Sequence, residues 1–201
     1  MEYELWPLIG SIVLLCVPSY LFFTSRIRRR VTESQPSSGF PLRGVVLTWQ
    51  NWLDLARGYG GAYLIFNLTF PLERRAETYF QELGIVAGIL ALGLMLNTYY
   101  RRRHLYCLAP AFMVVGISMV LYDWWIVLYG ALAGLVIGRV TNSAEAFLIT
   151  TGVIIGAFGY FVGGISLMLL LTCALTVLPI VYAFTTKRGL AIASIHGSLE
   201  E

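Results

Sequence analysis

The sequence predicts an all-α fold, a polytopic bundle of seven transmembrane helices with an interfacial amphipathic element before the second span. Composition is the first observation behind this prediction. Of 201 residues, 58% are hydrophobic and 12% are charged, and the charged fraction is about half that of a soluble domain. The second observation is that apolar residues gather in runs close to the ~17–25 residues that cross hydrocarbon. A water-soluble fold is therefore excluded.

The apolar runs place the spans in order along the chain. Arginines end the first run, the polar stretch 32–39 reads as a loop, and Asp123 and Gly163-Gly164 read as turns that divide longer apolar runs. The predicted spans are 5–23, 58–72 with an amphipathic lead-in at 45–57, 83–100, 105–122, 124–139, 146–163 and 165–184. We expect a single integral-membrane domain over 1–201, in which 185–201 form a short cytosolic tail.

The distribution of cations predicts the orientation of these spans. Alternate loops should collect Arg and Lys on the cytosolic side. Most cations do fall on one side, namely Arg26, Arg28, Arg29, Arg30, Arg43, Arg101, Arg102, Arg103, Arg139, Lys187 and Arg188. The other side holds Arg74 and Arg75 among mostly acidic residues. We therefore expect the N-terminus outside and the C-terminus in the cytosol, and the short loops favour a bacterial inner (cytoplasmic) membrane.

Two arginine clusters admit two interpretations. They fix the topology, and they are also candidate contacts for anionic lipid head groups. The residues concerned are Arg28, Arg29, Arg30, Arg101, Arg102 and Arg103.

Small residues at four-residue spacing predict where helices pack closely, because they let two backbones approach in lipid. The candidate helix-packing residues are Gly84, Gly88, Gly130, Gly134, Gly138, Gly152, Gly156, Gly159 and Gly163. Each face meets either another helix of this chain or a helix of a partner, and the sequence leaves both open. Two polar residues inside the spans, Asn67 and Asn97, are expected to hydrogen-bond across helices.

The stretch that begins at Thr48 has helical periodicity and two faces. At about 100° per residue, Gln50, Asp54 and Arg57 share one narrow sector, whereas Trp49 and Trp52 point the other way. This pattern is typical of an amphipathic helix at the cytosolic head-group level. The three-residue spacing lets Asp54 and Arg57 pair.

Two interpretations of this stretch remain open. In the structural one, the ion pair neutralises itself and the tryptophans anchor the helix at the interface. In the functional one, the helix lines a polar pocket that opens to the cytosol, where Arg57 could hold a phosphate or carboxylate. The candidate pocket residues are Gln50, Asn51, Asp54 and Arg57. Depth discriminates between the two, because ionisable groups deep in the membrane are expensive without a purpose. The glycines that follow, from Gly58, offer a bend into the membrane.

Asn51, Arg57 and Gly61 give this stretch a resemblance to the opening helix of CDP-alcohol phosphatidyltransferases. The resemblance covers about a dozen residues. That family's metal-binding run of aspartates is missing after Asp54, so we do not assign the chain to it.

Residues for other chemistry are sparse. The three cysteines, Cys16, Cys107 and Cys173, stand in separate apolar stretches, and His104 and His196 are isolated, so we expect no metal, cofactor or catalytic residues. We expect membrane lipids and either a protein partner or further copies of the chain as partners, and no nucleic acid. The predicted function is a non-catalytic subunit or structural partner in a larger membrane assembly. The alternatives are a small-solute or lipid transporter and a lipid-active enzyme at the cytosolic interface.

Overall fold

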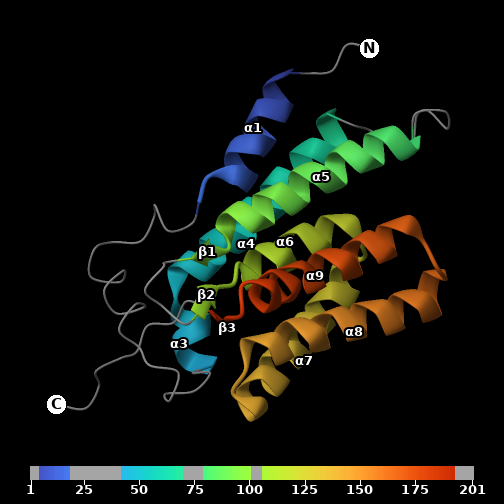
Figure 1. Cartoon of the computed structure of the whole chain (residues 1–201). Helices are drawn as coiled ribbons and strands as arrows, with labels where there is room; N and C mark the ends of the chain where they lie inside the picture. Colours follow the sequence, from blue (N-terminus) through green and yellow to red (C-terminus); the bar gives the residue numbers. More distant parts are fainter. Residues whose placement is uncertain (1–4, 19–41, 70–78, 101–105, 193–201) are drawn as a thin grey trace.

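The computed structural model describes residues 5–18, 42–69, 79–100 and 106–192. These residues form eight α-helices, one π-helix and three short strands, which confirms the all-α class (Figure 1). The elements are α1 (Leu5–Cys16), α3 (Leu42–Leu47), α4 (Trp49–Tyr63), η3 (Leu64–Thr69), α5 (Tyr79–Asn97), β1 (Tyr99–Tyr100), β2 (Tyr106–Leu108), α6 (Ala111–Leu121), α7 (Trp124–Thr141), α8 (Ala144–Gly163), α9 (Leu167–Thr185) and β3 (Gly189–Ala191).

The longer helices form a closed ring of neighbours. Going round it, α1 contacts α4, α4 contacts α6, α6 contacts α7, α7 contacts α8, α8 contacts α9, α9 contacts α5, and α5 returns to α1. Helix α6 also touches α9 across the ring, and nine of its 11 residues are buried. Helix α6 is therefore the inner helix of the bundle.

The expectation of seven spans is wrong. Within the described residues, four helices, α5, α7, α8 and α9, are long and apolar enough to cross a membrane. Helices α1 and α6 are apolar but have only 12 and 11 residues, which makes them about 18 and 16 Å long against ~30 Å of hydrocarbon. Helix α4 has 15 residues and carries two charges, Asp54 and Arg57.

The predicted span 105–122 shows why an apolar run alone misleads. Its first part, Tyr106–Leu108, is strand β2, and the helix begins only after Pro110 and ends before the extended backbone of Tyr122. An apolar helix of 10–14 residues is typical of a buried core helix. The run is apolar because other helices surround α6.

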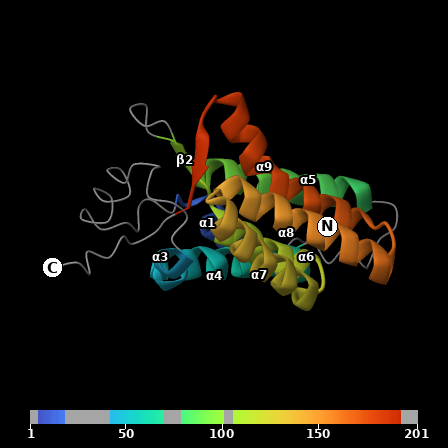
Figure 2. The same cartoon turned by 90° about the horizontal axis from the view of Figure 1, so that it is seen from below.

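The three short strands join helix ends that are distant in sequence. Strand β1 pairs antiparallel with β2, and β2 pairs parallel with β3. Residues Gly189–Ala191, which we expected in the tail, thereby become part of the bundle's end, to which the backbone N–H of Leu190 adds a bond of 2.7 Å to Glu145 Oε1. Figures 1 and 2 show the sheet and α3 at the same end of the helices, which we call the sheet end.

Burial follows the pattern of a protein whose solvent is lipid. Large apolar side chains are exposed, with Phe161 and Phe184 each at 83%. Hydroxyl groups lie inside, and those of Ser118 and Thr172 donate to the carbonyl four residues earlier in the same helix, at 2.8 and 2.7 Å. Hydrocarbon offers polar groups no partner, so they must be satisfied within the protein. Together with the four long apolar helices, this indicates an integral membrane protein.

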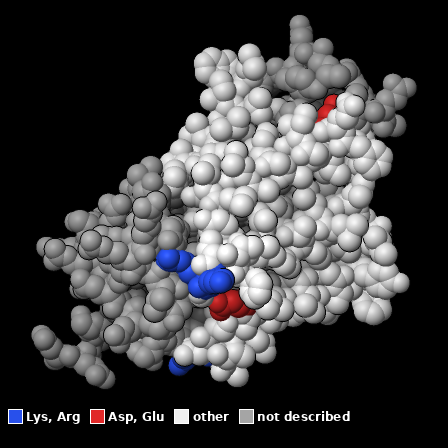
Figure 3. All heavy atoms as spheres, viewed as in Figure 1, with Lys and Arg blue, Asp and Glu red and all other residues white. Residues whose placement is uncertain are grey.

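The described surface cations gather at one end of the bundle. Arg139, Lys187 and Arg188 follow or end helices at the sheet end, and the acidic residues Glu82 and Asp123 lie at the opposite end. Glu145, which accepts from the N–H of Leu190, is an acidic residue at the sheet end. Figure 3 shows the blue cations near the sheet end with a red acidic group beside them, and a smaller red group at the far corner.

Helices α7 and α8 pack so closely that glycine is required at their contact. A Cβ on Gly134 would lie 2.7 Å from the carbonyl oxygen of Phe147 and would collide with the hydroxyl of Thr151. Gly130 and Gly138 face the same helix. On α8, a Cβ on Gly152 would lie 2.5 Å from the hydroxyl of Thr176 of α9. These glycine faces therefore meet helices of the same chain.

Gly134→Ala tests this contact. We expect it to lower the free energy of unfolding by about 1–3 kcal/mol, because backbone must move to admit the methyl group. Gly88→Ala is the control: no described atom lies within 4 Å of a Cβ there, and helix propensity should raise stability by up to about 1 kcal/mol. Unfolding by SDS in mixed micelles measures both. Equal effects of the two changes would contradict the packing described.

Candidate functional site

Helix α4 has the two faces that its sequence predicts. Gln50, Asp54 and Arg57 lie on one side and are buried, and Trp49 and Trp52 lie on the other at 51% and 52% exposure. The polar face is therefore directed into the protein and the aromatic face outward. This arrangement is the reverse of an amphipathic helix in water, and it suits a helix with lipid on its outer side.

The expected interfacial lead-in is not a separate element. Helix α4 runs from Trp49 through Arg57 and Gly58 to Tyr63 without a break and passes directly into η3. Asp54 and Arg57 are 8% and 5% exposed, so they belong to the interior of the bundle rather than to its surface. The glycines from Gly58 onward do not interrupt the helix. They serve close packing.

Arg57 holds two elements together. Its Nη1 donates to Asp54 Oδ1 at 3.1 Å within α4, and its Nη2 donates to the carbonyl oxygen of Val17, just past the end of α1. The last carbonyls of a helix lack partners in their own helix and carry partial negative charge. The guanidinium satisfies one of these orphan groups, so Arg57 acts as a cap for α1.

Asn97 of α5 also donates to an open carbonyl group at the end of α1. Its Nδ2 donates to the carbonyl oxygen of Leu15 at 2.6 Å and to that of Gly93 at 2.8 Å. The expected bond across helices is thus present for Asn97. Asn67 differs, because its Nδ2 donates at 3.3 Å to the carbonyl of Tyr63 in the preceding turn. The end of α1 is therefore fixed by side chains of both α4 and α5.

Two glycines that the pattern search missed bring α4 against α6. A Cβ on Gly58 would collide with the carbonyl oxygen of Met113, and one on Gly116 would collide with the carbonyl oxygen of Leu55. Each helix thus presents a glycine to the other's backbone. Neither glycine has a glycine partner four residues away on its own contact face, so a search for that spacing passes over them. An isolated glycine within a short apolar helix is the signal that could have found Gly116.

The first turn of α4 has its own hydrogen-bond arrangement. Asn51 Nδ2 donates to the carbonyl oxygen of Val45 at 2.7 Å, and Trp52 Nε1 donates to that of Val46 at 2.7 Å. These bonds tie α4 to α3. The side chain of the N-cap residue, Thr48, makes no cap hydrogen bond to α4, and its hydroxyl donates to the carbonyl oxygen of Gly44.

Gln50 is the exception in this satisfied cluster. Its side chain is 2% exposed, and neither its Nε2 nor its Oε1 has a hydrogen-bond partner. A buried amide without partners costs about 1–3 kcal/mol. Native interiors contain few such groups, and each calls for an explanation such as a bound water, ion or ligand.

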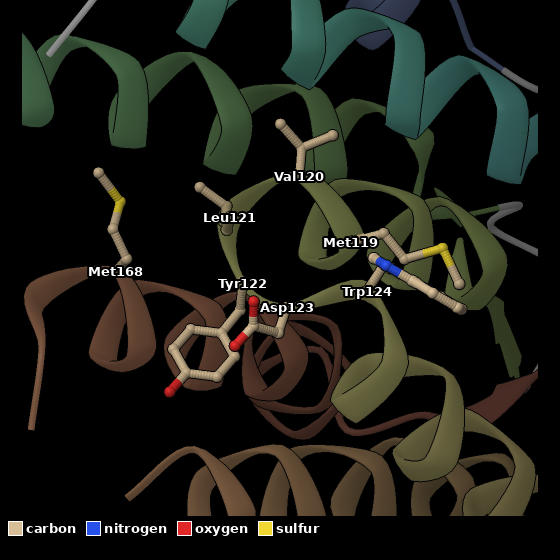
Figure 4. Close-up of a pocket in the computed structure, with 7 residues that line it drawn as sticks. All are labelled: Met119, Val120, Leu121, Tyr122, Asp123, Trp124 and Met168. Carbon is tan, nitrogen blue, oxygen red and sulfur yellow. The ribbon is translucent and has the colours of Figure 1, made fainter. Parts of the chain in front are cut away.

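The described part of the chain has a surface hollow of about 450 Å³ at the end of α6, away from this cluster. Figure 4 shows its lining, which comes from the turn between α6 and α7 and from Met168 of α9. The Tyr122 hydroxyl donates to the Gly159 carbonyl at 2.8 Å, so it anchors α8 rather than facing a ligand. Asp123 and the indole N–H of Trp124 are then the remaining polar groups of the lining, and the hollow lacks convergent chemistry.

Other predicted site residues divide into two groups. The candidate lipid contacts Arg28, Arg29, Arg30, Arg101, Arg102 and Arg103 lie outside the described residues. Gly84 and Gly88 of α5 are described, and no described atom lies within 4 Å of a Cβ built on either. Among the described residues, no three His, Cys, Asp or Glu side chains gather as metal ligands would.

The ion pair can be tested by a double-mutant cycle. Arg57→Met should lower the free energy of unfolding by about 3–5 kcal/mol, because it leaves the Asp54 carboxylate buried without its cation. Adding Asp54→Leu should restore most of this loss and leave about 1–2 kcal/mol for the lost cap of α1. Unfolding in mixed micelles measures all three variants. A double variant at least as unstable as the sum of the singles would contradict the coupling.

Comparison with known protein families, with curated proteins and with solved structures gives no match for this chain.

Proposed function

We propose that this protein is a non-catalytic subunit or structural partner in a larger membrane assembly, which it contacts through helix α5. The observation that carries the proposal is the uncovered glycine face of α5. Gly84 and Gly88 are exposed, and no described atom would touch a Cβ on either. Small residues four apart let a second helix approach closely in lipid.

The contrast with the other glycine faces supports this use. Those of α7 and α8 are filled by Thr151, Phe147 and Thr176 of neighbouring helices. On α5, the inward positions Val86, Leu90 and Leu94 are fully buried. The opposite stripe is exposed, and it consists of Gln81, Gly84, Ile85, Gly88, Leu92 and Met95.

The proposed occupant is a transmembrane helix of another protein. The stripe has a flat centre at its glycines with apolar side chains at Ile85 and Leu92 around it. In hydrocarbon, the gain from association comes from close van der Waals contact, and a smooth glycine surface maximises that contact. A helix with small residues at its own contact fits this surface.

A second candidate function rests on the buried cluster of α4. Its charges are buried in the protein, and buried charges in a membrane protein often mark a functional site. The alternatives are therefore a small-solute or lipid transporter and a lipid-active enzyme at the cytosolic interface. The ion pair and the cap of α1 account for Asp54 and Arg57 structurally. We therefore rank the subunit role first.

Gly88→Leu tests the subunit role. We expect the variant to lose a stoichiometric protein partner that copurifies with the wild-type protein in mild detergent, because the added side chain occupies the contact. The protein itself should keep its fold, since Gly88 has open space around it. Native mass spectrometry of the purified complex measures the outcome.

Ala157→Leu is the matched control for that experiment. It also enlarges an exposed small residue on a long apolar helix, but on α8, and it should retain the partner. Retention of the partner by both variants would contradict docking on α5. If the wild-type protein associates only with further copies of itself, the occupant of the α5 face is a second copy of this chain.

The proposed location is a bacterial inner membrane with the N-terminus outside and the sheet end in the cytosol. Thr141→Cys, at the sheet end, and Ile165→Cys, at the opposite end, test this in a chain whose three native cysteines are replaced. In intact cells, an impermeant maleimide should label Ile165→Cys, and it should label Thr141→Cys only after the membrane is opened. The reverse labelling would invert the topology.

A further inference from the structure

The outer face of α4 changes character along its length. Near the sheet end it carries Trp49 and Trp52, whose rings suit the head-group level. Farther along the helix and into η3, the exposed polar side chains are Tyr59, Tyr63 and Asn67. Their four-residue spacing places them on one side of the helix, and we call them the tyrosine–asparagine face.

The members of this face contact one another. The rings of Tyr59 and Tyr63 are stacked, with centroids 6.2 Å apart and planes inclined at 15°. Asn67 Nδ2 donates to the carbonyl oxygen of Tyr63 at 3.3 Å. The face is thus an aromatic surface continued by an amide, and no exposed position of α4 or η3 carries a charge.

The polar atoms of this face have unused hydrogen-bonding capacity. Among the described residues, no group bonds to the hydroxyl of Tyr59, to that of Tyr63 or to Asn67 Oδ1. A phenol hydroxyl and a carboxamide can each both donate and accept. Hydrocarbon offers these atoms no partner, whereas polar side chains of membrane helices commonly hydrogen-bond across a contact with another helix.

Depth distinguishes Tyr59 from tyrosines that reach the head groups. A Cβ on Gly116, in the middle of the inner helix α6, would lie 2.9 Å from the backbone N of Tyr59. Trp49 is ten residues away, about 15 Å along the helix, which is half of the ~30 Å of hydrocarbon. Tyr129 of α7 is also exposed, but it lies only about 8 Å from Trp124 at the start of its helix.

A second copy of this chain meets the requirements of the tyrosine–asparagine face. Two copies inserted in the same orientation can be related by a twofold axis along the membrane normal, which places residues near the axis opposite their own counterparts at the same depth. Phenol can then bond to phenol and carboxamide to carboxamide, because each is both donor and acceptor. The exposed positions of α4 and η3 are uncharged, so the copies do not repel each other there.

We propose that the tyrosine–asparagine face is the contact of a homodimer, in which the Asn67 carboxamides of two copies bond to each other and the tyrosine hydroxyls pair across the twofold axis. This contact is on a different helix from the α5 face and goes beyond the proposed function. It leaves both α5 faces open, so an assembly built on the dimer would contain two copies of this chain.

The test variant combines Tyr59→Phe, Tyr63→Phe and Asn67→Leu, which keep the size of the side chains and remove their polar groups. Full-length protein labelled with donor or acceptor fluorophores is reconstituted into vesicles, and energy transfer between copies is followed as added lipid dilutes the protein. We expect the wild-type protein to show a monomer–dimer equilibrium. The triple variant should dissociate at least about tenfold more readily, because it loses the hydrogen bonds across the contact.

Two controls and a cross-link locate the contact. Tyr129→Phe removes a hydroxyl from an exposed tyrosine of α7 and should dimerise like the wild-type protein. Gly88→Leu should also keep the dimer, because it alters only the α5 face. In a chain whose three native cysteines are replaced, Ala56→Cys, one turn before Tyr59 on the same face, should form a disulfide between copies on oxidation. Ala157→Cys, on α8, is equally exposed to lipid and should not.

Three results would overturn the proposal. The first is a wild-type protein that stays monomeric at every protein density in the vesicles, and the second is a triple variant that dimerises like the wild-type protein. The third is a dimer that Gly88→Leu abolishes and the triple variant retains, which would assign self-association to α5. Loss of a different protein partner by Gly88→Leu concerns only the proposed function and leaves the dimer unaffected.

Folding of the triple variant is checked by unfolding in mixed micelles at a dilution where the wild-type protein is monomeric. The variant should unfold no earlier than the wild-type monomer, because it replaces polar groups that face hydrocarbon with apolar ones. A loss of energy transfer at unchanged stability is then a loss of the contact between copies.

Discussion

The polar face of α4 is the constraint on which the rest of the structure depends. Hydrocarbon supplies no hydrogen bonds, so the charges of Asp54 and Arg57 and the open carbonyls at the end of α1 must find partners within the protein. Arg57 supplies these partners, because its guanidinium donates both to Asp54 and to the carbonyl oxygen of Val17. This arrangement requires α1 to stop beside the middle of α4, and Asn97 of α5 completes the same joint through Leu15.

Close backbone contact follows from that joint. With α1 on one side of α4, the inner helix α6 takes the other, and Gly58 and Gly116 admit it to backbone distance. Helices α7, α8 and α9 continue the ring by glycine contacts of their own. Packing at this distance replaces the hydrophobic driving force, which is absent between helices in lipid.

Two features are left over when these contacts are made. The outer stripe of α5 has glycines that no described helix uses, and the first turn of α4 has a buried amide without a partner. A partner helix on the first would cover the glycines. The second is a polar group whose burial lowers the stability of the isolated chain.

The sequence by itself determined the helical class, the gathering of the described surface cations at one end and the two faces of α4. These follow from composition and from a 100° period, which local chemistry sets. It could not determine how many helices are long enough to span, because an apolar run such as 105–122 looks the same whether lipid or other helices surround it. It also could not decide which glycines meet a helix. Only the tertiary structure decided that Gly134 is covered and Gly88 is open, that Gly58 packs against α6, and that Arg57 caps α1, because each of these depends on a neighbour distant in the sequence.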